Sequence, residues 1–253
     1  MFSWLHPKRK PIIVAHRGSS AIAPENTIAS FRQAVLDGAD AIELDVRLTR
    51  EGELVVLHDS RLNRCTNGRG LVRTHSLADL TRLDAGSWFH RTFAGERIPT
   101  LNQVLDLLPG AIGVNIELKI DRRDARGDEL TRRLAHIIRE DKTRHRILVS
   151  SFHHALVRQV KKLAPRIATG LLVHPLQRIG RLTLRKARAV NAECIILSGT
   201  SLRKGLLDPA HRNHFMVGEY TVNTRRRLRR AVRMGVDIIF TDKPASILRL
   251  LSK

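Results

Sequence analysis

The sequence is poor in cysteine, in aromatic side chains and in long apolar runs, and each shortage excludes a class of protein. Its 253 residues include two cysteines, Cys65 and Cys194, in no Cys-x-x-Cys pattern, so we expect reduced thiols and no disulfide framework. Aromatic residues make up 4% of the chain, too few for the base-stacking platforms of single-strand nucleic-acid binders. The longest apolar runs, such as Ile195–Leu197, are far too short for a transmembrane helix.

Acidic residues are scarce relative to basic ones. The chain has 45 Lys and Arg against 24 Asp and Glu, which gives a formal net charge of +21. Such an excess indicates an anionic partner, which is a nucleic acid, a membrane surface or a phosphate-bearing substrate. The basic segment Met1–Lys10 is followed by no apolar signal-peptide core, so we expect a cytoplasmic protein.

The remaining sequence predicts a (β/α)₈ TIM barrel. Short apolar segments recur with helix-like stretches between most of them, and their continuous apolar character is typical of parallel strands buried on both faces. Eight such strands in about 250 residues are the pattern of one barrel, so we expect a single domain over residues 1–253. The predicted strands are Ile12–Ala15, Ala41–Val46, Gly113–Leu118, Ile147–Ser150, Ala168–Val173, Cys194–Leu197, Phe215–Glu219 and Asp237–Phe240.

The interval between the second and third predicted strands interrupts the regular alternation of strand and helix. Residues 47–112 contain a predicted hairpin over residues 48–57, several turn signals and one helix near Leu101–Leu108. No linker rich in Gly, Ser or Pro marks a boundary, so we interpret the interval as a small insertion packed on the barrel. Other helices are expected to start at Thr27, near Asp128 and at Thr224, the first and last ending before Gly38 and Gly235.

Acidic side chains lie where two predicted strands end, and in such barrels the carboxyl ends of the strands form the active site. Glu43 and Asp45 are two residues apart and therefore face the same side, and so do Glu117 and Lys119. Three carboxylates in one buried site require a cation or raised pKa values. An all-oxygen set suits Ca²⁺, Mg²⁺ or Mn²⁺. For Glu43 and Asp45 alone, pairing with some of the many arginines is the favoured interpretation. The addition of Glu117, His16 and His58 reverses this preference and favours the cation site.

Other polar residues near the strand ends are candidates for proton transfer and phosphate binding. His16 and His58 suit a general acid and base because imidazole titrates near neutral pH. Arg17 and Lys119 suit the binding of a phosphate group. The segment Pro24–Thr27 opens the first helix, and we assign it mainly to helix capping and loop order.

An ordered set of motifs resembles the glycerophosphodiester phosphodiesterases, most closely the short bacterial cytoplasmic members. Any one motif is weak, but the set spans Val14 to Pro244 and together it is highly specific. The motifs are His16-Arg17-Gly18, Pro24-Glu25-Asn26-Thr27, Glu43-Leu44-Asp45-Val46, His58-Asp59, Arg64, Thr66, Gly68-Arg69-Gly70, Asn115-Ile116-Glu117-Leu118-Lys119, Ser150-Ser151-Phe152, Tyr220-Thr221-Val222-Asn223, Gly235-Val236-Asp237-Ile238-Ile239 and Thr241-Asp242-Lys243-Pro244.

The resemblance implies a barrel with an insertion after the second strand, and hydrolysis of a glycerophosphodiester to glycerol 3-phosphate and an alcohol. Carried over by position, the roles are as follows: Glu43, Asp45 and Glu117 bind one divalent cation, His16 and His58 form the acid–base pair, and Arg17 and Lys119 hold the phosphate. Which histidine is the acid stays open. So do the metal, the head group, and whether water or the substrate's own 2-hydroxyl attacks the phosphate.

Two positions depart from the family pattern. Tyr220 stands where the family usually has a tryptophan that packs on the glycerol, so Tyr220 is expected to bind substrate there. Cys65 stands where the family usually has threonine, which we expect to change only packing.

Other functions are alternatives to the hydrolysis of glycerophosphodiesters. A phospholipase C of the phosphatidylinositol type or a lysophospholipase D would use similar chemistry on a different substrate, but the ordered motifs fit the diesterase family better. A basic nucleic-acid-binding module without catalysis would explain the charge of +21, but no nucleic-acid-binding motif is present.

The helix predicted after Thr224 concentrates arginine. Leu228, Ala231 and Val232 are expected to face the barrel, while the arginine face points to solvent, away from the active site. The arginine face, opposite these apolar residues, consists of Arg226, Arg229, Arg230 and Arg233, flanked by Arg225 and Arg227.

The arginine face has two interpretations, a solvated surface or weak association with an anionic membrane surface. We favour the solvated surface, because most charged helix faces are solvated. Membrane association is supported by the first residues of the chain. There Phe2, Trp4 and Leu5 stand beside the bases of residues 8–10, a composition suited to an interface.

Overall fold

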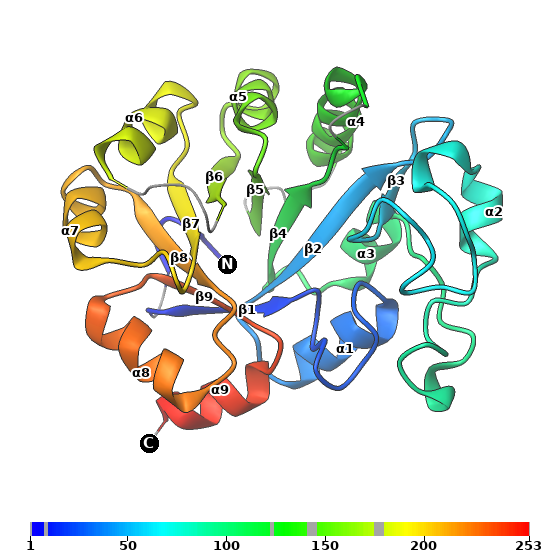
Figure 1. The fold of residues 1–253 in the computed structure, drawn as a ribbon, viewed down its shortest axis with the longest axis horizontal. Coiled ribbons are helices and arrows are strands. Elements are labelled where there is room, and N and C mark those ends of the chain that lie inside the picture. Colours follow the sequence, from blue (N-terminus) through cyan, green and yellow to red (C-terminus); the bar gives the residue numbers. More distant parts are fainter. Residues whose placement is uncertain (1, 8–9, 122–123, 141–145, 175–179, 253) are drawn as a thin grey trace.

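A computed structural model describes residues 2–7, 10–121, 124–140, 146–174 and 180–252. Within this part of the chain, eight parallel strands close into a barrel because β1 pairs with both β2 and β9 (Figure 1). The TIM-barrel prediction is therefore confirmed. The barrel strands are β1 (Ile12–His16), β2 (Ala41–Leu48), β4 (Gly113–Leu118), β5 (Ile147–Ser151), β6 (Ala168–Val173), β7 (Cys194–Ser198), β8 (Met216–Tyr220) and β9 (Ile238–Thr241).

Helices surround the barrel and follow its strands (Figure 1). They are α1 (Ile28–Leu36), α4 (Gly127–Glu140), α5 (His154–Leu163), α6 (Arg181–Ala189), α7 (Lys204–Arg212), α8 (Arg225–Met234) and α9 (Pro244–Leu251). No helix among the described residues is both long and apolar enough to span a membrane.

The insertion begins with a hairpin. β3 (Leu54–Val56) pairs antiparallel with the end of β2, with Leu48 opposite Leu54, as the turn signals predicted. The rest of the insertion consists of short elements at one side of the barrel: η1 (Val72–Thr74), α2 (Leu77–Thr81), η2 (Arg91–Phe93) and α3 (Leu101–Leu107). That residues 1–253 form one domain stays a prediction.

Local chemistry sets the helix boundaries. The Thr27 hydroxyl accepts a hydrogen bond from the Ser30 backbone N–H and so caps the start of α1. Gly235, with φ +79°, ends α8 in the left-handed conformation that glycine adopts without strain. The predicted starts and ends of these two helices are therefore confirmed.

The core forms an inner and an outer layer because strand side chains alternate. Ile12 and Val14 contact the cluster inside the barrel, whereas Ile13 and Ala15 contact clusters beneath the helices. The inner layer leaves no room for a pore at the amino end, so polar chemistry is confined to the carboxyl ends of the strands.

The N-terminal segment closes the amino end of the barrel. Trp4 is 1% exposed and packs with residues that begin several strands, such as Ala41 and Cys194. Its indole Nε1 donates a hydrogen bond to the Arg146 carbonyl at 2.8 Å. The expectation that Trp4 lies at a membrane interface is wrong, because barrel closure buries the ring. Of the bases expected beside it, residues 8 and 9 lie outside the described residues.

Helix α8 differs from its expected orientation at three positions. Val232 is 43% exposed, although the periodicity placed it inward. Arg230 is half-buried, because its long side chain reaches back to the carbonyls of Gly199 and Leu202, both at 2.7 Å. The Arg227 guanidinium donates to the Thr221 carbonyl at 2.8 Å, so not every arginine of this helix points away from the strand ends.

Candidate active site

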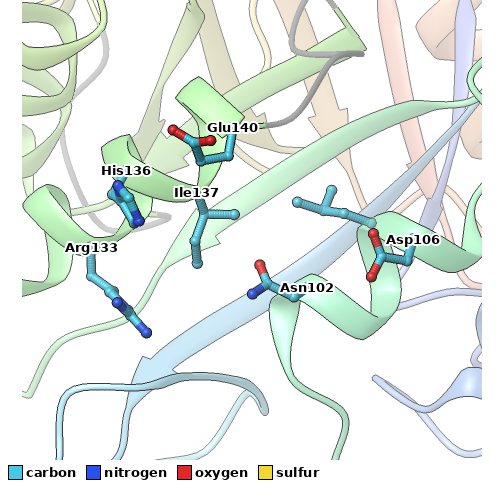
Figure 2. A pocket seen from close by; sticks show the side chains of 7 residues that line it. Asn102, Asp106, Arg133, His136, Ile137 and Glu140 are labelled. Carbon is cyan, nitrogen blue, oxygen red and sulfur yellow. The ribbon is translucent and has the colours of Figure 1, made fainter.

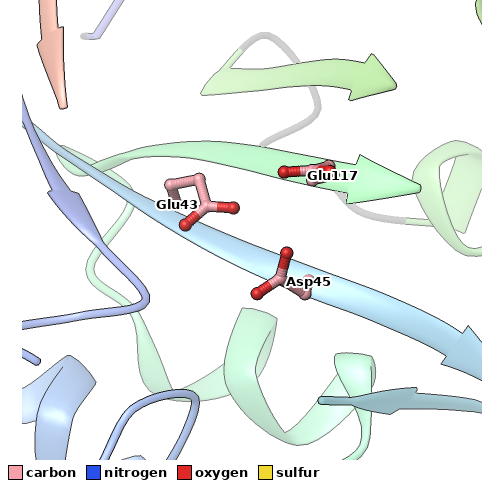
Figure 3. Close-up of side chains that lie close together, drawn as sticks. All are labelled: Glu43, Asp45 and Glu117. Carbon is pink, nitrogen blue, oxygen red and sulfur yellow. The ribbon is translucent and has the colours of Figure 1, made fainter. Parts of the chain in front are cut away.

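Three buried carboxylates meet at adjacent strands. β2 and β4 pair in a register that places Asp45 opposite Glu117, and Glu43 faces the same side as Asp45 (Figure 3). One oxygen atom of each carboxylate lies within 4.8 Å of the others. The sequence prediction that Glu43, Asp45 and Glu117 converge is therefore matched by the geometry.

Two cationic side chains partly neutralise the three carboxylates. Lys119 Nζ lies 3.2 Å from Asp45 Oδ1 and also forms an ion pair with Glu117. Arg17 Nε lies 3.3 Å from Asp45 Oδ2, and the Arg17 backbone N–H donates to Glu43 Oε2 at 2.9 Å. The alternative interpretation, in which the carboxylates pair with arginines, thus holds for Asp45. Two cations beside three carboxylates still leave one negative charge uncompensated.

Burial and the neighbouring charges shift the pKa values of the carboxyl groups. Burial, together with Asp45 and Glu117, raises the pKa of Glu43 well above its usual range. Burial raises the pKa of Glu117 to about 7 despite the ammonium group of Lys119. Burial also acts on Asp45, but Lys119 and Arg17 outweigh it and lower the pKa of that group.

The donor set fits a hard divalent cation. Glu43 Oε1 is buried and has neither a hydrogen-bond nor an ion-pair partner among the described residues. Asp45 Oδ1 and Glu117 Oε1 contact the ammonium group of Lys119, and the three carboxylates lie close together. Buried carboxylate oxygens at such spacing are the ligands that Ca²⁺, Mg²⁺ and Mn²⁺ prefer.

Each candidate histidine is oriented by a carboxylate. His16 ends β1, and its Nδ1 lies 2.7 Å from Asp242 Oδ1, while its Nε2 is 4.0 Å from Glu43 Oε2. His58 follows β3, and its Nδ1 lies 2.7 Å from Asp59 Oδ1. A carboxylate on Nδ1 fixes the ring and leaves Nε2 for another partner.

The environment of His58 favours its neutral form. Burial lowers the pKa of His58, and the positive charges of Lys119 and Arg17 add to that effect against the opposing influence of Asp45. A neutral imidazole can accept a proton, which is the property required of a general base.

These groups share a cavity of about 200 Å³ at the carboxyl ends of the strands. Its polar wall includes both histidines, and its other wall is apolar. Tyr220, the last residue of β8, contacts the Phe152 ring with 6.3 Å between centroids. The Tyr220 hydroxyl donates to the Val173 carbonyl at 3.3 Å, and burial raises the pKa of this phenol to about 12. The cavity is lined by His16, Arg17, Glu43, His58, Asn115, Glu117, Lys119, Phe152, Leu172, Ile196, Tyr220, Thr221 and Phe240.

The sequence interpretation missed a second layer of polar residues. Asn26 donates to Asp45 Oδ2 at 2.8 Å, and Glu25 accepts from Arg17 at 2.9 Å, so the segment Pro24–Thr27 does more than cap a helix. Asp59 and Asp242 also escaped assignment. A signal was available for both, because Asp59 is adjacent to His58 and Asp242 follows the last strand, at the edge where barrel sites form.

A separate hollow of about 310 Å³ lies between α3 and α4, outside the barrel (Figure 2). Asn102 and Asp106 of α3 face Arg133, His136 and Glu140 of α4. None of the predicted site residues lies there, so the candidate active site is the cavity at the strand ends.

Comparison with known proteins identifies the family. The sequence profile of the glycerophosphoryl diester phosphodiesterase family matches residues 16–246. The chain belongs to this family. The glycerophosphodiester phosphodiesterase of Caldanaerobacter subterraneus subsp. tengcongensis is 39% identical over 246 residues, which cover 96% of this chain and 99% of that protein. That of Bacillus altitudinis is 35% identical over 242 residues, with coverages of 94% and 97%.

Solved structures agree with this family assignment. An Oleispira antarctica phosphodiesterase, determined in complex with the product sn-glycerol-3-phosphate, superposes with a TM-score of 0.90 at 29% identity and covers 96% of this chain and 97% of its own. An Agrobacterium tumefaciens glycerophosphodiester phosphodiesterase gives a TM-score of 0.81 at 28% identity, with coverages of 98% and 100%. The resemblance inferred from motifs is confirmed, and this member of the family is a phosphodiesterase.

Proposed function

We propose that this phosphodiesterase hydrolyses glycerophosphodiesters to glycerol 3-phosphate and an alcohol, in phospholipid and glycerol metabolism, with one divalent cation held by Glu43, Asp45 and Glu117. The observation that carries the proposal is that Glu43 and Glu117 line one cavity with His16 and His58, while Asp45 lies within 4.8 Å of both carboxylates. The product complex of the Oleispira antarctica relative supports the choice of product.

The cationic groups are proposed to bind the phosphate. Arg17 and Lys119 line the cavity while each is held against Asp45, so their positive charges are fixed before substrate arrives. A bound Ca²⁺, Mg²⁺ or Mn²⁺ would polarise a phosphoryl oxygen and offset the negative charge of the transition state.

His16 and His58 are proposed to move the protons. One accepts the proton of the nucleophile and the other donates a proton to the leaving alkoxide, each contributing on the order of 10²–10⁴-fold. Nδ1 of each ring is occupied by a carboxylate, so Nε2 is the atom that exchanges the proton. The orientation given by Asp242 and Asp59 is thus part of the proposed chemistry.

Tyr220 is proposed to contact the glycerol carbons with its ring. It lines the cavity beside Phe152, and its hydroxyl is engaged with the Val173 carbonyl. We expect Tyr220→Ala to raise KM more than it lowers kcat, and Tyr220→Trp to keep KM near the wild-type value, because a ring of similar flatness is retained. An unchanged KM in the alanine variant would exclude this contact.

The decisive test is a panel of glycerophosphodiesters assayed for release of glycerol 3-phosphate, after chelation and after addition of Ca²⁺, Mg²⁺ or Mn²⁺. We expect activity only with a cation, and large losses of kcat in His16→Ala and His58→Ala. Full activity in the chelated enzyme would refute the metal proposal. A lysophospholipid and a phosphatidylinositol belong in the panel, since preferential cleavage of either would favour the lysophospholipase D or phospholipase C alternative.

A measurement independent of activity checks the metal site. Addition of the cation should raise the melting temperature of the wild-type protein, because a ligand that binds only the folded state stabilises it. In Glu43→Gln this increase should be much smaller. The cytoplasmic location stays a prediction, which cell fractionation tests.

A further inference from the structure

The positive charge of the chain is concentrated on three neighbouring helices. α6, α7 and α8 lie side by side on the side of the barrel away from the insertion (Figure 1). Together they carry twelve bases and one acid, Asp208, which is a net charge of +11 out of +21. We call these bases the cationic wall: Arg181, Arg185, Lys186, Arg188, Lys204, Arg212, Arg225, Arg226, Arg227, Arg229, Arg230 and Arg233.

The cationic wall is exposed and unpaired. All of its members except Arg230 are exposed, and none forms an ion pair with a carboxylate of the described residues. Some bases elsewhere on the barrel are paired. Arg133 of α4 binds Glu53, and Lys161 of α5 binds Glu193. Arg227 and Arg230 act electrostatically on the buried carboxyl group of Glu219. Apart from these two, the wall presents a field of like charges that no ion pair with the described residues neutralises.

Helix stability does not explain where these bases lie. The first turns of α6, α7 and α8 contain bases and no acid, although the N-terminal end of a helix favours negative charge. By contrast, α4 begins with Asp128 and Glu129, as the helix dipole favours. Three adjacent helices thus each begin with bases, where the helix dipole favours acids. This shared departure indicates that the positive charge has a function.

Apolar side chains stand exposed among the bases. Leu182 on α6 is 56% exposed, and Val232 on α8 is 43% exposed. Bases that surround exposed aliphatic side chains suit the surface of an anionic membrane, where the bases bind head groups and the aliphatic groups enter the interface. The three helices contain no Phe, Tyr or Trp that could stack on nucleic-acid bases.

We propose that the cationic wall docks this enzyme on anionic lipid surfaces. The proposal does not depend on the reaction assigned to the cavity, because the wall contains none of the proposed catalytic residues. Nor does it require Trp4, which is buried. Binding is electrostatic and therefore weakens as salt shortens the range of the charges.

The test is flotation with vesicles of phosphatidylglycerol and, separately, of phosphatidylcholine, at low and high salt. The wild-type protein should float with phosphatidylglycerol at low salt, remain behind at high salt, and not bind phosphatidylcholine. The triple variant Arg226→Ala, Arg229→Ala, Arg233→Ala should lower the partition coefficient about a hundredfold, since each base near anionic lipid contributes about fivefold.

A variant with the same loss of charge elsewhere is the matched control. Arg32 on α1 and Arg132 and Arg139 on α4 are exposed and lie outside the wall. Their replacement by alanine should reduce binding far less, and both triple variants should hydrolyse soluble glycerophosphocholine at the wild-type rate. Absence of flotation at low salt, equal losses in the two variants, or tighter binding to a DNA duplex than to vesicles would each overturn the proposal.

Discussion

At the scale of single residues, Arg64 links two parts of the active site that are distant in sequence. Its guanidinium binds Asp59 at 2.6 and 3.2 Å and Glu25 at 2.7 and 2.9 Å. Asp59 orients His58, and Glu25 holds Arg17. One side chain of the insertion therefore positions both a proposed acid–base group and a proposed phosphate ligand.

We expect Arg64→Ala to lower kcat about 10–100-fold, the usual effect of removing a partner that orients a functional group. Arg64→Lys should rescue little of this loss, because an ammonium cannot bind two carboxylates in the fork geometry of a guanidinium. Steady-state kinetics on a soluble glycerophosphodiester measures both. The control is Arg61→Ala, an exposed base of the same segment. If Arg61→Ala and Arg64→Ala behave alike, the bridge has no role in catalysis.

Glu117 makes the stability of the metal-free protein depend on pH. Its folded pKa of about 7 lies above the usual value of 4.5, so folding favours the protonated carboxyl group. The stability that this gives is present below about pH 4.5 and is lost as pH rises through about 7. In chelator, the melting temperature of Glu117→Gln relative to wild type should therefore be higher at pH 8 than at pH 5.

Thermal unfolding of both proteins across that pH range measures the difference. Saturating cation should reduce it, because bound positive charge favours the ionised carboxylate in the wild-type protein. A difference that is constant from pH 5 to pH 8 would show that Glu117 does not titrate there.

At the scale of elements, the N-terminal segment acts as part of the barrel core. Trp4 fills the amino end and makes a buried hydrogen bond to the backbone of Arg146. We expect Trp4→Ala to lower the free energy of unfolding by about 3–5 kcal/mol, as for other buried large side chains. Denaturant unfolding measures this change.

The neighbouring Leu5 is the matched control, since it is 42% exposed. Leu5→Ala should change the free energy of unfolding by less than about 0.5 kcal/mol. Both variants should keep the wild-type kcat under conditions where they are folded, because the amino end of the barrel is remote from the cavity. Equal stability of the two variants would contradict the closing role of Trp4.

The sequence was sufficient for most strands and for their order. Continuous apolar segments such as Ala168–Val173 coincide with observed strands, since burial on both faces leaves a direct trace in composition. The starts of β8 and β9 were misplaced by one residue. Asp237 was assigned to the last strand, but its buried carboxylate instead binds Lys10, His211 and the Val217 backbone. Such long-range partners leave no local pattern.

At the scale of the whole molecule, the difference between local sequence patterns and long-range contacts explains how much of the active site could be predicted. Residues that face the cavity lie on strands or directly after them, where alternation and register place them together. Their supporting partners depend on contacts between distant segments. His16 and Asp242, for example, are 226 positions apart. Prediction from one sequence therefore reached the groups that line the cavity and missed those that hold them.

Closure of the barrel by β1 and β9 has a consequence for how the enzyme is made. β1 leaves the ribosome among the first elements, yet Ile12 pairs with Ile238, near the far end of the chain. Until β9 has emerged, the nascent chain exposes the unpaired edges of β1 and β8, which are sites for aggregation. His16 likewise lacks Asp242 until then. The closed barrel and the oriented His16 therefore form only late in synthesis, and a chain that ends before its last strand has neither.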